Sequence, residues 1–259
     1  MIDLINAKKE FDKFVSNYNP ENPRIALKIG HIERVVNVSQ EIAKNLNLSK
    51  EEIKLAMLIG YFHDLGRFEQ VRRTNSFSDR DTGLNHAELS VKILFENGLI
   101  RNFIIDTKYD EIIKKAVLNH NKPYIEENLS EKELLFSKII RDSDKLDIFY
   151  TITFDTFPAI FWYEGFDSEK IDDIVMNEYE SGSFINYDNI NNNADMILAF
   201  YGYVYDLNFP VSLKYLVDKK YMEIFKTRLL EHFSSPIVKK QIEHVHSIYH
   251  NYINSKTLK

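Results

Sequence analysis

The sequence predicts an all-α protein, and two observations support this fold class. Glycine and proline are scarce, with 8 and 6 among 259 residues, and a chain with few turn-forming residues favours long helices over sheets. Apolar residues recur every three to four positions along several segments, and no segment shows the sustained alternation that is typical of a strand. We therefore expect helices throughout.

The first helices follow in order from this spacing. Residues 3–18 form the first expected helix and residues 25–46 the second, because each carries an apolar stripe of helical period. Ser49 and Glu52 predict a capping box that opens the third helix. That helix is apolar nearly all round, so it should lie deep in the core. We expect Gly66 to end it in the left-handed conformation.

The remaining elements are expected on the same grounds. A polar stretch predicts a loop over residues 72–85, and Ser130 with Glu133 predicts a second capping box. Further helices are expected over residues 86–97, 109–121, 130–151, 168–179 and 195–206, and from Leu213 onward with a break at Pro236.

Composition limits the classes of partner. The formal net charge is −6, whereas a protein that binds duplex nucleic acid usually carries a basic surplus. Cysteine is absent, so a transition-metal site must use His, Asp or Glu. The start of the chain lacks signal-peptide features, and no apolar run is long enough to span a bilayer. We therefore expect a cytoplasmic protein that contacts neither membrane nor duplex nucleic acid.

The adjacent pair His63 and Asp64 is the sharpest feature of the sequence, because it lies in the most apolar expected helix. A buried carboxylate without a partner costs several kcal/mol, so a cation should lie beside Asp64. Arg67 or a metal ion could supply that charge. The alternative is that Asp64 pairs with Arg67 or caps a helix, while His63 is a hydrogen-bonded core residue.

Two distant residues favour the metal. His31 lies near the start of the second helix and His63 near the end of the third, so antiparallel packing would bring them to the same level. Asp144 lies in the apolar-flanked segment IIRDSDKLDIF. Together with Asp64, these side chains offer nitrogen and oxygen ligands that suit a divalent ion.

The ordered set His31, His63, Asp64 and Asp144 resembles the H…HD…D signature of the HD-domain superfamily of metal-dependent phosphohydrolases. The segments KIGHIERVVNVSQEIA, AMLIGYFHDLGRF and KIIRDSDKLDIF carry the resemblance. It implies an HD-domain helical bundle in which these four residues coordinate the metal. Asp144 is preferred over its neighbours Asp142 and Asp147 because Lys145-Leu146 follows it, as in the family's Asp-[Lys/Arg]-Leu.

The resemblance also sets the expected organisation of the chain. We expect one all-helical HD-type domain over residues 1–259, with the metal-binding core at about 25–155. A helical extension should follow at about 156–259.

His86 and His120 raise the question of a second metal ion. Both lie between the HD pair and Asp144, similar to the pattern H…HD…H…H…D, in which the HD aspartate bridges two ions. The alternative is that each lies at a helix end and lines the pocket to contact phosphate. One or two divalent ions are therefore expected, with Mn, Fe, Mg, Ni, Co and Zn all compatible.

The expected activity is hydrolysis of a phosphomonoester or phosphodiester in a nucleotide or another small phosphorylated metabolite. Asp64 could orient or deprotonate the attacking water. Arg67 and Lys145 adjoin the metal ligands in sequence and could stabilise charge on the phosphoryl oxygens, unless both are solvated surface charges. The alternative functions are a non-catalytic nucleotide-binding HD regulatory module and a di-iron oxygenase.

The C-terminal region offers weaker signals. Its many Tyr and Phe residues are interpreted as core or homodimer contacts. His246 and His250 have the i, i+4 spacing that a metal site could use, but no carboxylate motif accompanies them in the sequence. We therefore interpret both as surface residues.

Overall fold

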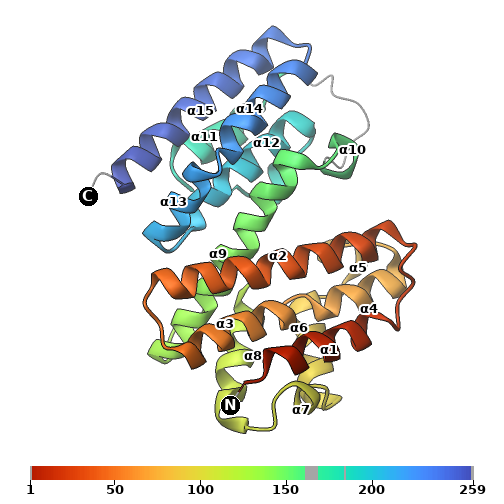
Figure 1. The fold of residues 1–259 in the computed structure, drawn as a ribbon. Helices are drawn as coiled ribbons and strands as arrows, with labels where there is room; N and C mark the ends of the chain where they lie inside the picture. The colour runs from red at the N-terminus through yellow and green to blue at the C-terminus, as the bar shows by residue number, and fades with distance from the viewer. Residues whose placement is uncertain (1, 161–168, 184, 258–259) are drawn as a thin grey trace. The chain divides into compact units, whose positions relative to one another are not determined.

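The computed structural model describes residues 2–160, 169–183 and 185–257. Every regular element within these ranges is helical (Figure 1), which confirms the all-α prediction. The chain divides into two compact units, Met1–Asp147 and Ile148–Lys259, and each is described by itself. The expectation of one domain over the whole chain stays a prediction.

The N-terminal unit holds the first nine α-helices. Their bounds are α1 Leu4–Val15, α2 Pro23–Asn45, α3 Lys50–Phe62, α4 Leu65–Thr74, α5 Asp79–Thr82, α6 His86–Val91, α7 Ile100–Phe103, α8 Asp110–Asn119 and α9 Glu131–Phe154, whose residues up to Asp147 belong to this unit. A π-helix, η1 Lys92–Glu96, extends α6, and a 3-10 turn, η2 Thr107–Tyr109, precedes α8.

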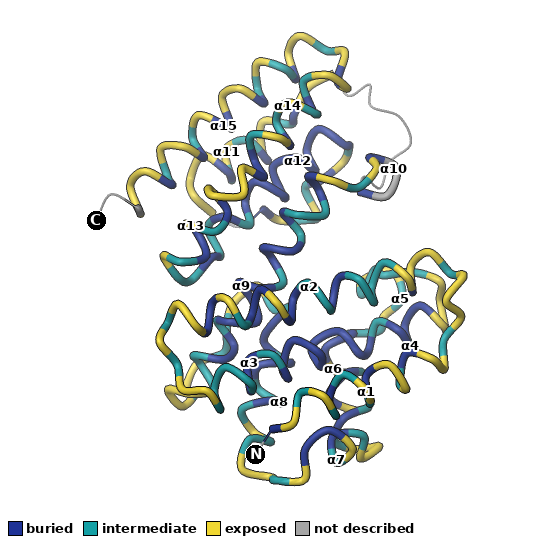
Figure 2. Tube along the Cα trace, in the orientation of Figure 1, coloured by how far each residue is buried: buried dark blue, intermediate teal, exposed yellow. Residues whose placement is uncertain are grey.

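Helix α3 is the centre of this unit, as its apolar composition predicts. Its second half is almost completely buried (Figure 2), and α2 packs along it. The predicted capping box is present, because the Ser49 side chain accepts from the Glu52 N–H while the Glu52 carboxylate accepts from the Ser49 N–H. The same exchange between Ser130 and Glu133 opens α9.

The predicted role of Gly66 is wrong. Helix α3 ends at Phe62, and Gly66 lies inside α4 without a left-handed backbone. A Cβ atom at this position would lie 2.1 Å from the carbonyl oxygen of His86 and 2.7 Å from the backbone nitrogen of Ser90. Gly66 is therefore needed for the close approach of α4 to α6, which is a tertiary requirement.

The expected loop over residues 72–85 is partly wrong, because α4 continues to Thr74 and the short helix α5 follows. Asn75 ends α4 in the left-handed conformation with a φ of 52°, which asparagine tolerates better than most residues. The helices expected over residues 86–97, 109–121 and 130–151 are present as α6 with η1, as α8 and as α9.

The C-terminal unit is also helical. Its elements are α10 Phe157–Ile160, α11 Asp173–Glu180, α12 Asn193–Gly202, α13 Pro210–Asp218, α14 Tyr221–His232 and α15 Pro236–Thr257, with 3-10 turns at η3 Tyr187–Asn189 and η4 Tyr203–Asp206. The predicted break at Pro236 is confirmed, because this residue begins α15. Part of the helix expected over residues 168–179 is α11, and Ser168 itself lies outside the described residues.

Helix α12 forms the core of this unit. All of its residues from Asn193 to Gly202 are buried, and it contacts α11 and α15. Among the residues that the structure describes, each helix is too short or too polar to cross a bilayer.

Candidate metal centre

Asp64 lies at the junction between α3 and α4. His63 is the C-cap residue of α3 and Asp64 the N-cap residue of α4, yet the Asp64 side chain makes no capping hydrogen bond. The hydroxyl of Ser90 in α6 accepts from the N–H of Gly66 at 2.8 Å and donates to the carbonyl of His63 at 2.9 Å. These bonds fix the junction, so the Asp64 carboxylate is directed into the N-terminal unit.

The four residues of the predicted signature lie together. His31 Nε2 is 3.2 Å from His63 Nε2, 3.2 Å from Asp144 Oδ1 and 3.5 Å from Asp64 Oδ2. His31 comes from α2 and Asp144 from α9, so three separate parts of the chain meet at this point. The antiparallel approach of α2 and α3 brings the two imidazoles to one level, as the sequence predicts.

His86 and His120 form a second group around the other oxygen of Asp64. Their Nε2 atoms are 2.9 Å apart. Asp64 Oδ1 lies 3.3 Å from His86 Nε2 and 3.6 Å from His120 Nε2. The carboxylate of Asp64 is therefore divided, with Oδ2 facing His31 and His63 and Oδ1 facing His86 and His120.

Two of the four imidazoles are oriented by backbone carbonyls at the ends of their own helices. His63 Nδ1 donates to the carbonyl of Gly60 at 2.8 Å, and His120 Nδ1 donates to that of Val117 at 2.6 Å. His63 caps α3 and His120 caps α8. With the proton on Nδ1, each ring presents an Nε2 lone pair to the centre.

Carboxylates orient the other two imidazoles. His31 Nδ1 donates to Asp147 Oδ2 at 2.7 Å, and His86 Nδ1 donates to Asp79 Oδ2 at 2.6 Å. Asp147 also accepts two hydrogen bonds from Arg34, at 2.6 and 3.0 Å. All four Nδ1 atoms thus bond outward while all four Nε2 atoms converge, which is the arrangement that orients histidine ligands of metal ions.

In the metal-free centre, the pKa of His31 moves in the opposite direction from the pKa values of His63 and His86. Burial disfavours charge and lowers the pKa of His63 to about 3 and that of His86 to about 4. Burial also opposes protonation of His31, but hydrogen bonds to Asp144, Asp147 and Asp64 outweigh it and raise the pKa of His31 to about 10. His31 therefore carries a positive charge when no ion is bound.

The carboxylates respond to the same groups. Burial alone would raise the pKa of Asp64, but the charge of Lys28 and the surrounding imidazoles hold the pKa of Asp64 well below its ordinary value. His31 likewise outweighs burial and lowers the pKa of Asp144. Both acids are thus ionised, as metal ligands must be.

The residues fit a divalent ion. Asp64 Oδ1 is buried and has no hydrogen-bond partner among the described residues. Neighbouring Nε2 atoms lie 2.9 to 3.2 Å apart, and ligand atoms held about 2.0–2.2 Å from one ion lie at roughly this spacing. A cation would satisfy the orphaned oxygen and the converging nitrogens together, and two groups of three such residues meet here.

Lys28 is a site residue that sequence reasoning missed. Its Nζ lies 2.6 Å from Asp64 Oδ2, and its side chain is only 15% exposed. Lys28 is thus the direct ionic partner of Asp64, whereas Arg67 Nε is 3.7 Å from Asp64 Oδ1. Lys28 precedes His31 by three residues on α2, so the shared helix face was the available signal.

Arg67 is held in place by the segment that follows α4. Its Nη1 atom donates to Asp79 Oδ1 at 2.7 Å, to Gln70 Oε1 at 2.7 Å and to the carbonyl of Phe77. Asp79 therefore links Arg67 to His86. Arg67 is only 16% exposed and Lys145 is buried, so the alternative that both are solvated surface charges is wrong. The catalytic roles of Asp64, Arg67 and Lys145 stay predictions.

Arg141 holds the end of α8 beside His120. This fully buried residue of α9 donates to the carbonyls of Asn119 at 2.7 Å, of Lys122 at 2.6 Å and of Pro123 at 3.2 Å. These carbonyls flank His120, so the end of α8 is tied to the helix that carries Asp144.

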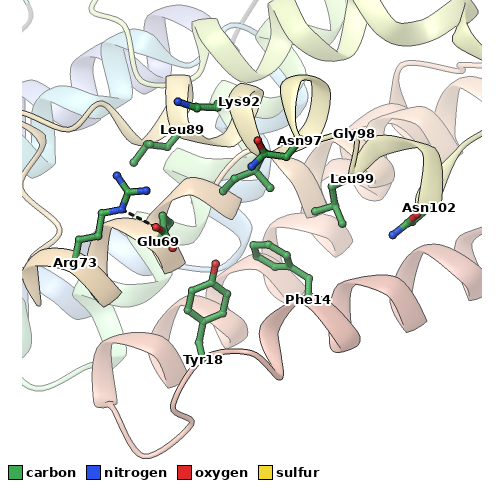
Figure 3. Close-up of a pocket in the computed structure, with 11 residues that line it drawn as sticks. Phe14, Tyr18, Glu69, Arg73, Leu89, Lys92, Asn97, Gly98, Leu99 and Asn102 are labelled. Carbon is green, nitrogen blue, oxygen red and sulfur yellow. Dashed lines mark hydrogen bonds and ion pairs between the residues drawn. The ribbon is translucent and has the colours of Figure 1, made fainter.

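A surface pocket of about 430 Å³ lies elsewhere in this unit (Figure 3). Phe14 and Tyr18 line it on one side, and an ion pair between Arg73 and Glu69, 2.6 Å long, lies at its edge. None of its lining residues belongs to the two histidine groups, so the pocket is separate from the metal centre.

The comparison with known families agrees with this geometry. Residues 29–148 match the model of the HD domain family, and the match includes all four histidines, Asp64 and Asp144. No curated protein and no solved structure matches the chain. The matched segment and the converging histidines and aspartates together show that this chain carries an HD domain, of the superfamily of metal-dependent phosphohydrolases.

Proposed function

We propose that this protein hydrolyses a phosphomonoester or phosphodiester bond in a nucleotide or another small phosphorylated metabolite, with one or two divalent ions. The observation that carries the proposal is the divided carboxylate of Asp64. One oxygen faces His31 and His63, and the other faces His86 and His120.

The ligand set follows from this division. His31, His63, Asp64 and Asp144 would hold the first ion, and Asp64, His86 and His120 would hold a second. A divalent ion at such a site lowers the pKa of a bound water and polarises a phosphoryl oxygen. The donors are imidazole nitrogens and carboxylate oxygens, which suit Mn, Fe, Co, Ni or Zn and accept Mg less readily.

Cationic side chains beside Asp64 would stabilise charge on the phosphoryl oxygens. Lys28 and Arg67 both lie within 4 Å of this carboxylate, and both approach the ring of Phe77, at 5.4 and 6.0 Å from its centroid. Lys28 Nζ lies 2.6 Å from Asp64 Oδ2, so with Asp64 engaged as a metal ligand the Lys28 ammonium would be in position to bind a substrate oxygen. Lys145 would be a further candidate, since it follows Asp144 directly.

The test is elemental analysis of gently purified protein, joined to a panel of phosphomonoesters and phosphodiesters assayed with added Mn²⁺. His63→Ala and Asp64→Ala should each lose both retained metal and turnover, because each removes a ligand of the first ion. His244→Ala is the matched control, since His244 is exposed and bonds Glu180 at 2.8 Å in the other unit. Full metal content and turnover in either ligand variant would overturn the assignment.

The same samples separate the alternatives. His86→Ala should lower the metal content by one ion per chain if two ions bind, and should leave it unchanged if His86 contacts phosphate. Nucleotide binding without turnover in metal-replete protein would indicate a regulatory module. Substrate-dependent oxygen consumption by iron-loaded protein would indicate an oxygenase.

A further inference from the structure

A third group of ligand-type side chains lies in the C-terminal unit. His246 and His250 of α15 have Nε2 atoms 3.0 Å apart, and Glu223 Oε1 of α14 is 3.6 Å from His250 Nε2. One ligand atom from each of the three lies within 4.8 Å of the other two. All three belong to the unit Ile148–Lys259, so this cluster shares no residue with the HD domain.

The two helices explain why the residues meet. An i, i+4 spacing places both imidazoles on one face of α15. Helix α14 packs along α15 (Figure 1), and Glu223 lies in its first turn. The carboxylate absent from the local sequence is thus supplied by a neighbouring helix. The interpretation of His246 as a surface residue is wrong, because it is only 6% exposed.

The surroundings of His246 hold its ring in one orientation. His246 Nδ1 lies 3.0 Å from the hydroxyl of Tyr201, a fully buried residue of α12. The ring also stacks on Tyr249, with centroids 5.6 Å apart and an interplanar angle of 26°. Nδ1 is therefore engaged on the core side, and Nε2 is directed to His250. This is the outer support that histidine ligands of metals usually have.

One atom of the cluster has no partner. Glu223 Oε2 is buried and makes no hydrogen bond among the described residues. A hydrogen bond between the imidazoles of His246 and His250 would satisfy one nitrogen lone pair. It would still leave this carboxylate oxygen without a hydrogen-bond partner. A cation held among the three side chains would satisfy both nitrogens and the carboxylate.

We propose that Glu223, His246 and His250 bind one divalent transition-metal ion, of which Zn²⁺ is the best match. Two ligands held about 2.0–2.1 Å from a tetrahedral zinc ion are roughly 3.3 Å apart. The His246–His250 and His250–Glu223 separations of 3.0 and 3.6 Å lie on either side of this value, and the third pair, Glu223 and His246, lies within 4.8 Å. Two imidazoles with one carboxylate suit zinc better than magnesium, which prefers oxygen ligands and water.

The site is open on one side. The side chain of His250 is 47% exposed and that of Glu223 is 39% exposed, so the fourth position would face solvent and take a water molecule. An ion bound here joins α14 to α15. Its binding free energy therefore adds to the stability of this unit, because the unfolded chain does not hold the three ligands together.

The experiment uses the full chain with Zn²⁺ as the probe. The number of tightly bound ions per chain is measured by elemental analysis after desalting, and thermal unfolding is followed with and without added Zn²⁺. The variants Glu223→Gln and His250→Ala are chosen because both side chains are partly exposed, which keeps the folding risk small. His244→Ala is the matched control, because His244 lies on the same helix, is exposed and bonds Glu180 at 2.8 Å.

We expect Glu223→Gln and His250→Ala each to bind one Zn²⁺ ion fewer per chain than the parent. Any rise in unfolding temperature that Zn²⁺ gives to this unit should shrink in both variants and persist in His244→Ala. Metal content equal to that of the parent in folded Glu223→Gln and His250→Ala would overturn the proposal. A loss of one ion in His244→Ala as well would also overturn it, since the ion would then be bound by scattered surface histidines.

Discussion

Asp147→Asn should weaken metal binding at the HD domain although Asp147 is not one of the expected ligands. Asp147 is buried and accepts hydrogen bonds from His31 Nδ1 at 2.7 Å and from Arg34 at 2.6 and 3.0 Å. An asparagine amide has one accepting and one donating end. If its oxygen takes the place of Oδ2 and faces His31, its NH₂ group opposes Arg34 Nε, which donates to Oδ1. If its NH₂ group faces His31 instead, the imidazole must take the tautomer that removes the Nε2 lone pair.

Neither orientation preserves both interactions, so the expected loss is that of an outer-shell partner, about 10- to 100-fold in metal affinity. This corresponds to about 1.4–2.8 kcal/mol. The assay is calorimetric titration of metal-free protein with Mn²⁺. Asp110→Asn is the matched control, because Asp110 also pairs with an arginine, Arg101, but lies at the far end of α8 from His120. An affinity for Mn²⁺ within twofold of the parent in folded Asp147→Asn would refute the reasoning.

Three further predictions follow from the described contacts. Carboxylates raise the pKa of His31 to about 10 despite its burial, so metal binding must displace the proton of this imidazole. The apparent metal affinity should therefore rise by about tenfold per pH unit between about pH 7 and 9. Calorimetric titrations across this range measure the affinity, and an affinity that does not change with pH would contradict the prediction. Arg141→Met should cost on the order of 3 kcal/mol in urea unfolding, because three carbonyls lose a charged donor; a cost below about 0.5 kcal/mol would show that these bonds contribute little. Gly66→Ala should destabilise by about 3 kcal/mol or more and lower metal retention, since its methyl group would overlap the His86 carbonyl. Gly30→Ala should cost less, because its methyl group would meet only Arg34 Nη1, at 3.3 Å.

The sequence was sufficient to predict those parts of the site that depend on helical spacing and on the apolar surroundings of single residues. The apolar surroundings of Asp64 required a cation, and helical spacing placed His31, His63 and Asp144 at levels where they could meet. His86 and His120 lay at the expected ends of helices. The structure brings the other five of these side chains together around the Asp64 carboxylate.

The remaining features depend on tertiary contacts that local patterns do not contain. No sequence pattern distinguishes Lys28 from a solvated lysine on a helix surface. Only the packing of α2 on the α3–α4 junction places it beside Asp64. Gly66 carried a typical helix-stop signal, yet its role is the close approach of α4 to α6. Glu223 is more than twenty residues from His246, so the spacing of the two histidines alone could not reveal their carboxylate partner.

The caps formed by His63 and His120 connect ion binding to the length of two helices. If α3 continued without interruption, the carbonyl of Gly60 would accept from the N–H of Asp64, four residues later. The interruption instead leaves this carbonyl to the imidazole, and the carbonyl of Val117 serves His120 in the same way. A substitution that prolonged either helix by one turn would therefore set the wrong tautomer without altering any ligand, so helix termination itself is part of the coordination chemistry.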